Sequence, residues 1–243
     1  MILVLCIYAF PIRLFDLGNT EYNALKIVKC LLFSIIILRL IKNEFGSIKY
    51  LFGVIDKRIV FYLPVIILSC IYILLNLSKF EYINNDNIVL TSLTLSATLL
   101  ATFSEELVFR GYFQKLLIKS NINIKQSIIF SSIIFSSMHF ANIYRNDYDI
   151  WSVFSQISVA FFIGIFLGSL FVLRQNIIFV TSLHFIYNIP ASLYSIRSIE
   201  LERISDGANT PVSLLENIFS VILYILIHFR MNPITSCHDF FLC

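Results

Sequence analysis

Charged residues are scarce in this chain. Of its 243 residues, 14% are Asp, Glu, Lys or Arg, whereas 58% are hydrophobic. Soluble domains carry about 25% charged residues, so the composition excludes a soluble globular protein and indicates a multispanning membrane protein. The formal net charge of +3 is also too small to indicate a nucleic-acid partner. The lipid bilayer is therefore the first partner that the sequence predicts.

Features that would indicate a cleaved leader or a structural metal site are missing too. The apolar residues 1–15 have no basic leader and no small-residue cleavage site, so we expect them to be retained as a membrane span. The five cysteines show neither CxxC nor zinc spacing, and three of them lie in apolar runs. No soluble segment is long enough to fold by itself, so we expect residues 1–243 to form a single membrane domain.

Long apolar segments are abundant in the chain. A helix rises 1.5 Å per residue, so about 20 apolar residues cross the roughly 30 Å core of a bilayer. Segments that approach this length lie at 2–17, 25–41, 58–78, 87–114, 125–143, 151–173, 177–195 and 212–229. Lys26, Arg39 and Lys42 crowd the second segment, which could instead lie partly in the interface. The predicted fold class is all-α: an integral membrane bundle of about eight transmembrane helices with a buried polar active site.

Basic residues between these segments predict the orientation of the chain. The connections that follow the second, fourth, sixth and eighth segments are richer in Lys and Arg than the others. Because basic connections stay on the cytoplasmic side of a membrane, both termini are expected in the cytoplasm. The small size and the absence of an organelle signal favour the cell membrane of a bacterium.

Strongly polar side chains inside the segments are few. Away from the segment ends they are Glu105, Glu106, Arg110, His139, His184 and Asn188. A carboxylate near the middle of a bilayer costs several kcal/mol, so a functional reason for it is expected. At 1.5 Å per residue, Glu105, His139 and His184 lie about 15, 21 and 15 Å from the basic ends of their helices. This common depth on three helices predicts one shared polar pocket.

Glu105 and Glu106 are neighbours with different expected surroundings. Glu106 lies four residues before Arg110, so the two share a helix face and are expected to form a structural ion pair. Glu105 points about 100° away from Glu106 and needs a partner from another helix. In the segment that carries His184, Pro190 frees a backbone carbonyl, which predicts a bend beside a wet cavity.

Three fragments on separate predicted spans carry a family resemblance: Glu105-Glu106-x-x-x-Arg110, Phe135-x-x-x-His139 and His184-x-x-x-Asn188. Together they resemble the signature of the CPBP family, the CAAX protease and bacteriocin-processing or Abi family of intramembrane proteases. The resemblance covers about residues 85–195, the expected catalytic core. It implies hydrolysis of a peptide bond in a membrane-associated protein or peptide, and for a bacterial member a part in bacteriocin processing or self-immunity.

The resemblance and the helix geometry suggest a role for each residue. Glu105 is the candidate general base for a water molecule, which His139 would help to hold and polarise. His184 and Asn188, one turn apart, would donate to the oxyanion of the tetrahedral intermediate. The ion pair beside Glu105 would fix the helix and orient this base.

The sequence leaves the cofactor and the functional class open. Glu105, His139 and His184 could equally supply one carboxylate and two imidazoles to Zn²⁺, and no HExxH motif is present to decide between a metal-bound and a metal-free water. A non-enzymatic immunity or transport protein could use the same buried groups as a proton relay. A haem between the two histidines would leave both glutamates unexplained.

Overall fold

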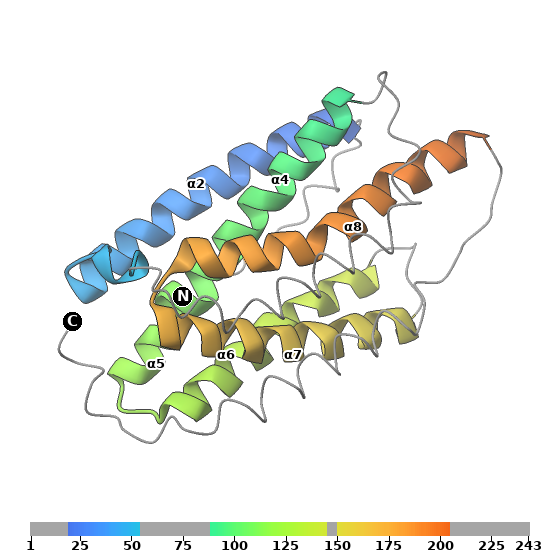
Figure 1. Cartoon of the computed structure of the whole chain (residues 1–243). Coiled ribbons are helices and arrows are strands. Elements are labelled where there is room, and N and C mark those ends of the chain that lie inside the picture. The colour runs from blue at the N-terminus through green and yellow to red at the C-terminus, as the bar shows by residue number, and fades with distance from the viewer. Residues whose placement is uncertain (1–18, 54–87, 145–149, 205–243) are drawn as a thin grey trace.

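The chain is helical wherever the computed structural model describes it, which is over residues 19–53, 88–144 and 150–204 (Figure 1). These residues form no β-strand, and an isolated bridge joins Phe52 to Asn176. The predicted all-α class is confirmed for this part of the chain. The predicted segments 2–17, 58–78 and 212–229 lie outside the described residues, so the number of eight spans stays a prediction.

Five of the predicted segments are found as helices. The long helices are α2 (Asn19–Phe45), α4 (Ile88–Glu106), α6 (Ile124–Ser137), α7 (Ile150–Arg174) and α8 (Ile177–Ile204). The shorter elements are η2 (Lys49–Leu51), η6 (Leu107–Gln114), α5 (Lys115–Lys119) and η7 (Met138–Tyr144). The last helix continues beyond the end at residue 195 that its apolar pattern predicts, because its final turns are polar.

Two helices in the described part of the chain are long and apolar enough to cross a membrane. They run from Ile88 to Lys119 and from Val153 to Arg174, and a shorter apolar helix spans Ile177–Leu193. The first of them is formed by α4, η6 and α5 in succession. It is therefore the spanning helix that carries the pair of adjacent glutamates.

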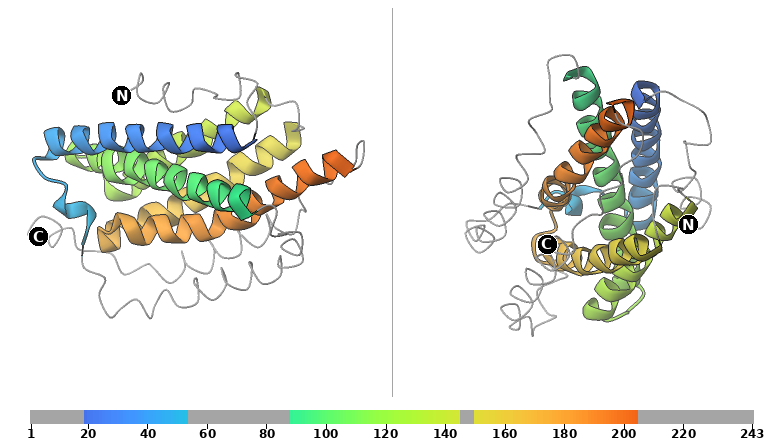
Figure 2. Two further views of the ribbon diagram at one scale, coloured as in Figure 1. Left: turned by 90° about the horizontal axis from the view of Figure 1, so that it is seen from above. Right: turned by 90° about the vertical axis from the view of Figure 1, so that its right-hand side faces the viewer.

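The helices are arranged around α4. This helix packs against α2 on one side and α8 on the other, while α6 packs against α7. Figure 2 shows α4 between its two neighbours, with α6 and α7 together beneath them. Because η6 contacts α2, α6, α7 and α8, the residues directly after the glutamates lie at the point where the two groups of helices meet.

The last long helix, α8, bends along its length, as both ribbon figures show. Pro190 lies inside it. A proline lacks the N–H that would bond the carbonyl four residues earlier, so it is the expected cause of a bend. The bend that the sequence predicts is present in the structure.

The helix that carries the glutamates changes its winding directly after Glu106. Residues Leu107–Gln114 are wound as a π-helix before α5 restores the α-helix. Such wide turns are rare and are frequently found at functional sites. The chain then turns at Asn121, which has a φ of 61°, and the side chain of Asn123 caps α6 by accepting a hydrogen bond from the backbone N–H of Lys125.

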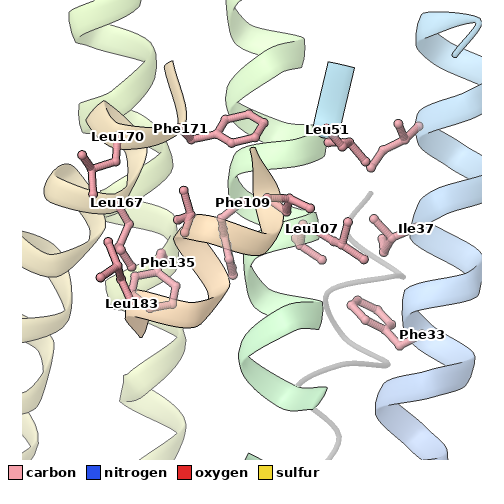
Figure 3. Packing of buried hydrophobic residues seen from close by; sticks show 14 of the residues in the cluster. Phe33, Ile37, Leu51, Leu107, Phe109, Phe135, Leu167, Leu170, Phe171 and Leu183 are labelled. Atoms are coloured by element: carbon pink, nitrogen blue, oxygen red, sulfur yellow. The ribbon is translucent and has the colours of Figure 1, made fainter. Parts of the chain in front are cut away.

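The main apolar core surrounds η6. Figure 3 shows Leu107 beside Ile37 of α2, and Phe109 beside Phe135 of α6. All four side chains are buried and belong to one cluster that also includes residues of α7 and α8. Helices associate in lipid through close packing rather than through hydrophobic burial, so the fit around η6 holds the groups of helices together.

Glycines allow α7 to approach its neighbours closely. A Cβ atom on Gly164 would lie 2.9 Å from Cβ of Ser132 in α6, and one on Gly168 would lie 2.8 Å from Oε1 of Gln114. Both distances are shorter than any normal contact. A larger residue at Gly164 would force Ser132 and α6 to shift, whereas one at Gly168 would first displace the flexible side chain of Gln114. Gly164 and Gly168, which have the Gly-x-x-x-Gly spacing common in membrane helices, therefore permit close contact between α7 and its neighbours.

Replacing Gly164 by valine is expected to destabilise the protein by about 1–3 kcal/mol, because the added methyl groups would overlap Ser132. Thermal unfolding of the full chain in detergent measures this effect. Ser158→Val is the matched control, since Ser158 lies on the same helix and is exposed. Equal melting temperatures for the two variants would show that the α6–α7 contact is not tight.

Candidate active site

The carboxylate of Glu106 is the most enclosed charged group of the site. Its side chain is fully buried, and its Oε1 atom accepts a hydrogen bond from Nη1 of Arg110 at 3.1 Å. The same oxygen lies 2.7 Å from Nδ1 of His184. Its second oxygen, Oε2, has no hydrogen-bond partner among the described residues. The expected ion pair is thus present, and it includes a third member that the sequence did not indicate.

The contact with Glu106 determines which nitrogen of His184 carries a proton. An ionised carboxylate can only accept hydrogen bonds, so Nδ1 of His184 is the donor. The other ring nitrogen, Nε2, then points toward Glu105, whose Oε2 atom is 4.0 Å away. The imidazole therefore lies between the two adjacent glutamates, with one glutamate at each nitrogen.

Glu105 lies in a more open position than its neighbour. One quarter of its side chain is exposed, whereas the side chains of Glu106 and His184 are at most 5% exposed. A separation of 4.0 Å from Nε2 of His184 is too long for a direct hydrogen bond. A water molecule that contacts both groups would satisfy them at this separation.

His139 approaches the same site from α6 and η7. The α-helix ends at Ser137, so His139 lies in the 3₁₀ turn of η7 rather than in a continuous α-helix. The ring of Phe135 is in edge contact with both imidazoles, with centroid distances of 5.6 Å to His139 and 5.7 Å to His184. Phe135 thus packs against both histidines.

The polar surroundings of His139 are incomplete. Its Nδ1 atom is buried and has no partner within hydrogen-bond geometry in the described part of the chain, although the carbonyls of Phe135 and Ser136 lie nearby. Glu105 and His184 are close enough to act on the ring electrostatically. Glu105 and His184 therefore face each other, and His139 packs beside them against Phe135; that the three share one pocket stays a prediction.

Asn188 lies one turn after His184 on α8 and is partly buried. Its Nδ2 atom is 3.5 Å from Oγ1 of Thr102, which is a long hydrogen bond. The sequence suggests that His184 and Asn188 donate to one oxyanion. Since Nδ1 of His184 is bound to Glu106, only Nε2 is available for that role.

A metal ion does not fit these residues as they are placed. The described residues contain no group of three His, Cys, Asp or Glu side chains close enough to hold one. The bond from Nδ1 of His184 to Glu106 leaves Nε2 available as a ligand, so the reason is the spacing of the three side chains. The set of Glu105, His139 and His184 therefore does not form a three-ligand site in this arrangement, and the mechanism proposed below contains no metal step.

Side chains of η2 and α6 donate hydrogen bonds to the backbone of the π-helix. Tyr50 donates to the carbonyl of Gly111 at 2.6 Å, and Ser131 donates to that of Phe109 at 2.8 Å. Burial raises the pKa of the Tyr50 phenol, so the phenol stays protonated and remains a donor. No spacing in the sequence indicates these two residues, because they lie on other elements, 61 and 22 residues from their targets along the chain.

Side chains of η6 also bind the backbone of α7. Arg110 donates to the carbonyl of Gly164 at 3.2 Å, and Gln114 donates to that of Gly168 at 3.0 Å. The guanidinium of Arg110 further lies over the ring of Phe135, 4.7 Å from its centroid. Each glycine carbonyl can be reached because no side chain stands beside it. Arg110 thus contacts the buried carboxylate, the aromatic ring that packs against both histidines, and the backbone of α7.

Comparison with known proteins agrees with this geometry. Residues 85–190 match the family model described as type II CAAX prenyl endopeptidase Rce1-like. No curated protein and no solved structure matches the chain. The matched range lies within the predicted core and contains the three signature fragments on α4–η6, on α6–η7 and on α8. Residues 85–190 are therefore similar to the CAAX-type endopeptidases of the CPBP family, and the apolar helices indicate an integral membrane protein.

Proposed function

We propose that the chain hydrolyses a peptide bond of a membrane-associated protein or peptide with a water molecule activated by Glu105. The observation that carries this proposal is the position of His184, with Glu106 at one ring nitrogen and Glu105 at the other. A partly exposed carboxylate that faces an imidazole of fixed orientation is suited to activating water. Purely structural contacts would not require Glu105 to remain partly exposed.

In this mechanism Glu105 removes a proton from the water while the oxygen attacks the carbonyl carbon of the substrate. His184 enters the reaction with a proton on both ring nitrogens and keeps both, so the oxyanion that forms accepts hydrogen bonds from its Nε2–H and from the amide of Asn188. Glu105 then delivers its proton to the leaving nitrogen, and the C–N bond breaks. Glu106 stays ionised throughout and stabilises the positive charge on the imidazole.

His139 completes the proposed site as a second contact for the water. Its buried, unpartnered Nδ1 atom gives the ring a polar group that a water molecule could satisfy. The zinc alternative differs in that the same water would be bound by a metal held by Glu105, His139 and His184. This alternative needs the three side chains to move closer together than the structure places them.

The setting proposed for the reaction is the cell membrane of a bacterium, with both termini in the cytoplasm. Basic residues that follow the even-numbered segments support this orientation. A leader peptide or a segment of a membrane protein is the proposed substrate, and bacteriocin processing or self-immunity is the proposed process. The depth of the site along an apolar spanning helix favours a substrate that is itself embedded in the bilayer.

Glu105→Gln is expected to lower peptide cleavage about 10²- to 10⁴-fold, because an amide cannot accept the proton of the water. Purified protein in detergent with a library of quenched fluorescent peptides measures this loss. Glu44→Gln is the control, since it removes a carboxylate that is exposed and paired with Lys119. Equal signals from the wild type and from Glu105→Gln would favour a non-enzymatic immunity or transport protein.

Glu106→Gln is expected to destabilise the fold by about 3–5 kcal/mol, because it leaves the buried charge of Arg110 without a counter-charge. The exposed Glu44–Lys119 pair should contribute only about 0–1 kcal/mol by comparison. Unfolding of both variants in detergent, followed by circular dichroism, measures the difference. Losses of equal size would mean that the buried pair has no special role in stability.

Cleavage is expected to continue in millimolar 1,10-phenanthroline, because Glu105 activates the water without a metal in the proposed mechanism. The assay is the same peptide library, and an unrelated zinc protease serves as the positive control for chelation. A complete loss of activity that added Zn²⁺ restores would contradict the metal-free mechanism. It would instead support a zinc ion held by Glu105, His139 and His184.

A further inference from the structure

Three side-chain hydrogen bonds join α4 to α8, and the bond between Glu106 and His184 is one of them. These two helices run in opposite directions, and polar residues recur on each at every fourth position. We call the six residues the polar seam: Thr98, Thr102 and Glu106 on α4, and Ser192, Asn188 and His184 on α8. The three pairs are separated by 2.9, 3.5 and 2.7 Å in that order.

The far pair of the seam, Thr98 with Ser192, is well removed from the reacting groups. Two helical turns, or about 12 Å along α4, separate Thr98 from Glu106. The Oγ atoms of Thr98 and Ser192 are 2.9 Å apart. Thr98 can also donate to the carbonyl of Thr94 at 2.8 Å, and Ser192 to that of Asn188 at 2.9 Å. Since each hydroxyl has one proton, the pair is a hydrogen bond shared among several acceptors.

Such a pair can set the register of one helix on another. Apolar side chains do not select a register strongly in lipid, where sliding exposes no hydrophobic surface to water. A slip of α8 by one turn would move His184 about 5.4 Å along α4 and away from Glu106. It would also leave one end of the polar seam without its partner on the facing helix.

Ser192 and His184 lie on opposite sides of the bend in α8, and a hydrogen bond of Ser192 links the two sides. Pro190 removes one backbone hydrogen bond from α8. Ser192 donates from beyond the proline to the carbonyl of Asn188, one turn after His184. The hydroxyl therefore connects the two parts of α8 while it also contacts α4.

We propose that Thr98 and Ser192 are positioning residues that set the register of α8 on α4 and so hold the imidazole of His184 between Glu106 and Glu105. Neither residue belongs to the signature fragments, and neither touches the reacting atoms. This proposal depends on the proposed function only in the experiment that measures cleavage. The position of His184 can be measured without any cleavage activity.

The test uses the full chain in detergent with Thr98→Val, Ser192→Ala and the double variant. The exchange Thr98→Ser with Ser192→Thr keeps both hydroxyls and serves as the rescue. Ser182→Ala is the matched control, because Ser182 lies on the same helix, is exposed, and donates within the helix to the carbonyl of Ile178 at 2.9 Å.

The first measurement is the NMR signal of the Nδ1 proton of His184 in protein with ¹⁵N-labelled histidine. The chain has only four histidines, and the signal is identified by its absence from the spectrum of His184→Gln. We expect the signal to shift or broaden in each single variant and equally in the double variant, because all three lose the same contact. It should be unchanged in the exchange variant and in Ser182→Ala.

The second measurement is cleavage. Hydrogen bonds between membrane helices are weak, so a loss of about 3- to 15-fold is expected. It should appear in kcat rather than in KM, while melting temperatures stay close to that of the wild type. If Thr98→Val unfolds early, Ser192→Ala alone carries the test, since Thr98 keeps its bond to Thr94.

An unchanged His184 signal in the double variant would overturn the proposal, as would an equal change in Ser182→Ala. If no variant and no wild-type protein cleaves any peptide, the proposed function fails. The NMR result then still decides whether Thr98 and Ser192 position His184.

Discussion

One buried carboxylate organises the site. One oxygen of Glu106 accepts hydrogen bonds from Arg110, which follows on the same helix, and from His184 of α8. A charge in this position is tolerated only when donors surround it, and removing a donor leaves a buried charge uncompensated. Through Arg110 the same group is linked to the backbone of α7 and to the ring of Phe135 in α6. The positions of three helices therefore depend on one charged group.

The π-helix explains how so many polar contacts fit into an apolar core. Backbone carbonyls of this segment accept hydrogen bonds from the side chains of neighbouring elements. Tyr50 and Ser131 donate to two carbonyls of this segment. In lipid an unpaired carbonyl costs several kcal/mol, because no water can replace the missing donor. The π-helical winding after Glu106 is thus stabilised by these hydrogen bonds. The same bonds hold Tyr50 and Ser131 in position.

The sequence predicts the elements better than it predicts their contacts. Apolar length predicts five of the described helices, and the shared depth of Glu105, His139 and His184 predicts that they meet. The bond from His184 to Glu106 could not be predicted in the same way. Helical spacing relates residues on one helix, whereas this bond depends on the rotation of α8 against α4, and many small contacts determine that rotation. The π-helix was also unpredictable, since its donors come from distant parts of the chain.

The adjacency of the two glutamates has a geometric reason. Residues one position apart on a helix point about 100° away from each other and differ by only 1.5 Å along the axis. Two carboxylates four apart would share a face and repel each other. Adjacent carboxylates can instead approach the two nitrogens of a single imidazole from different sides, as they approach His184 here. One glutamate can then be buried as a fixed counter-charge, while the other stays open enough to exchange a proton with water.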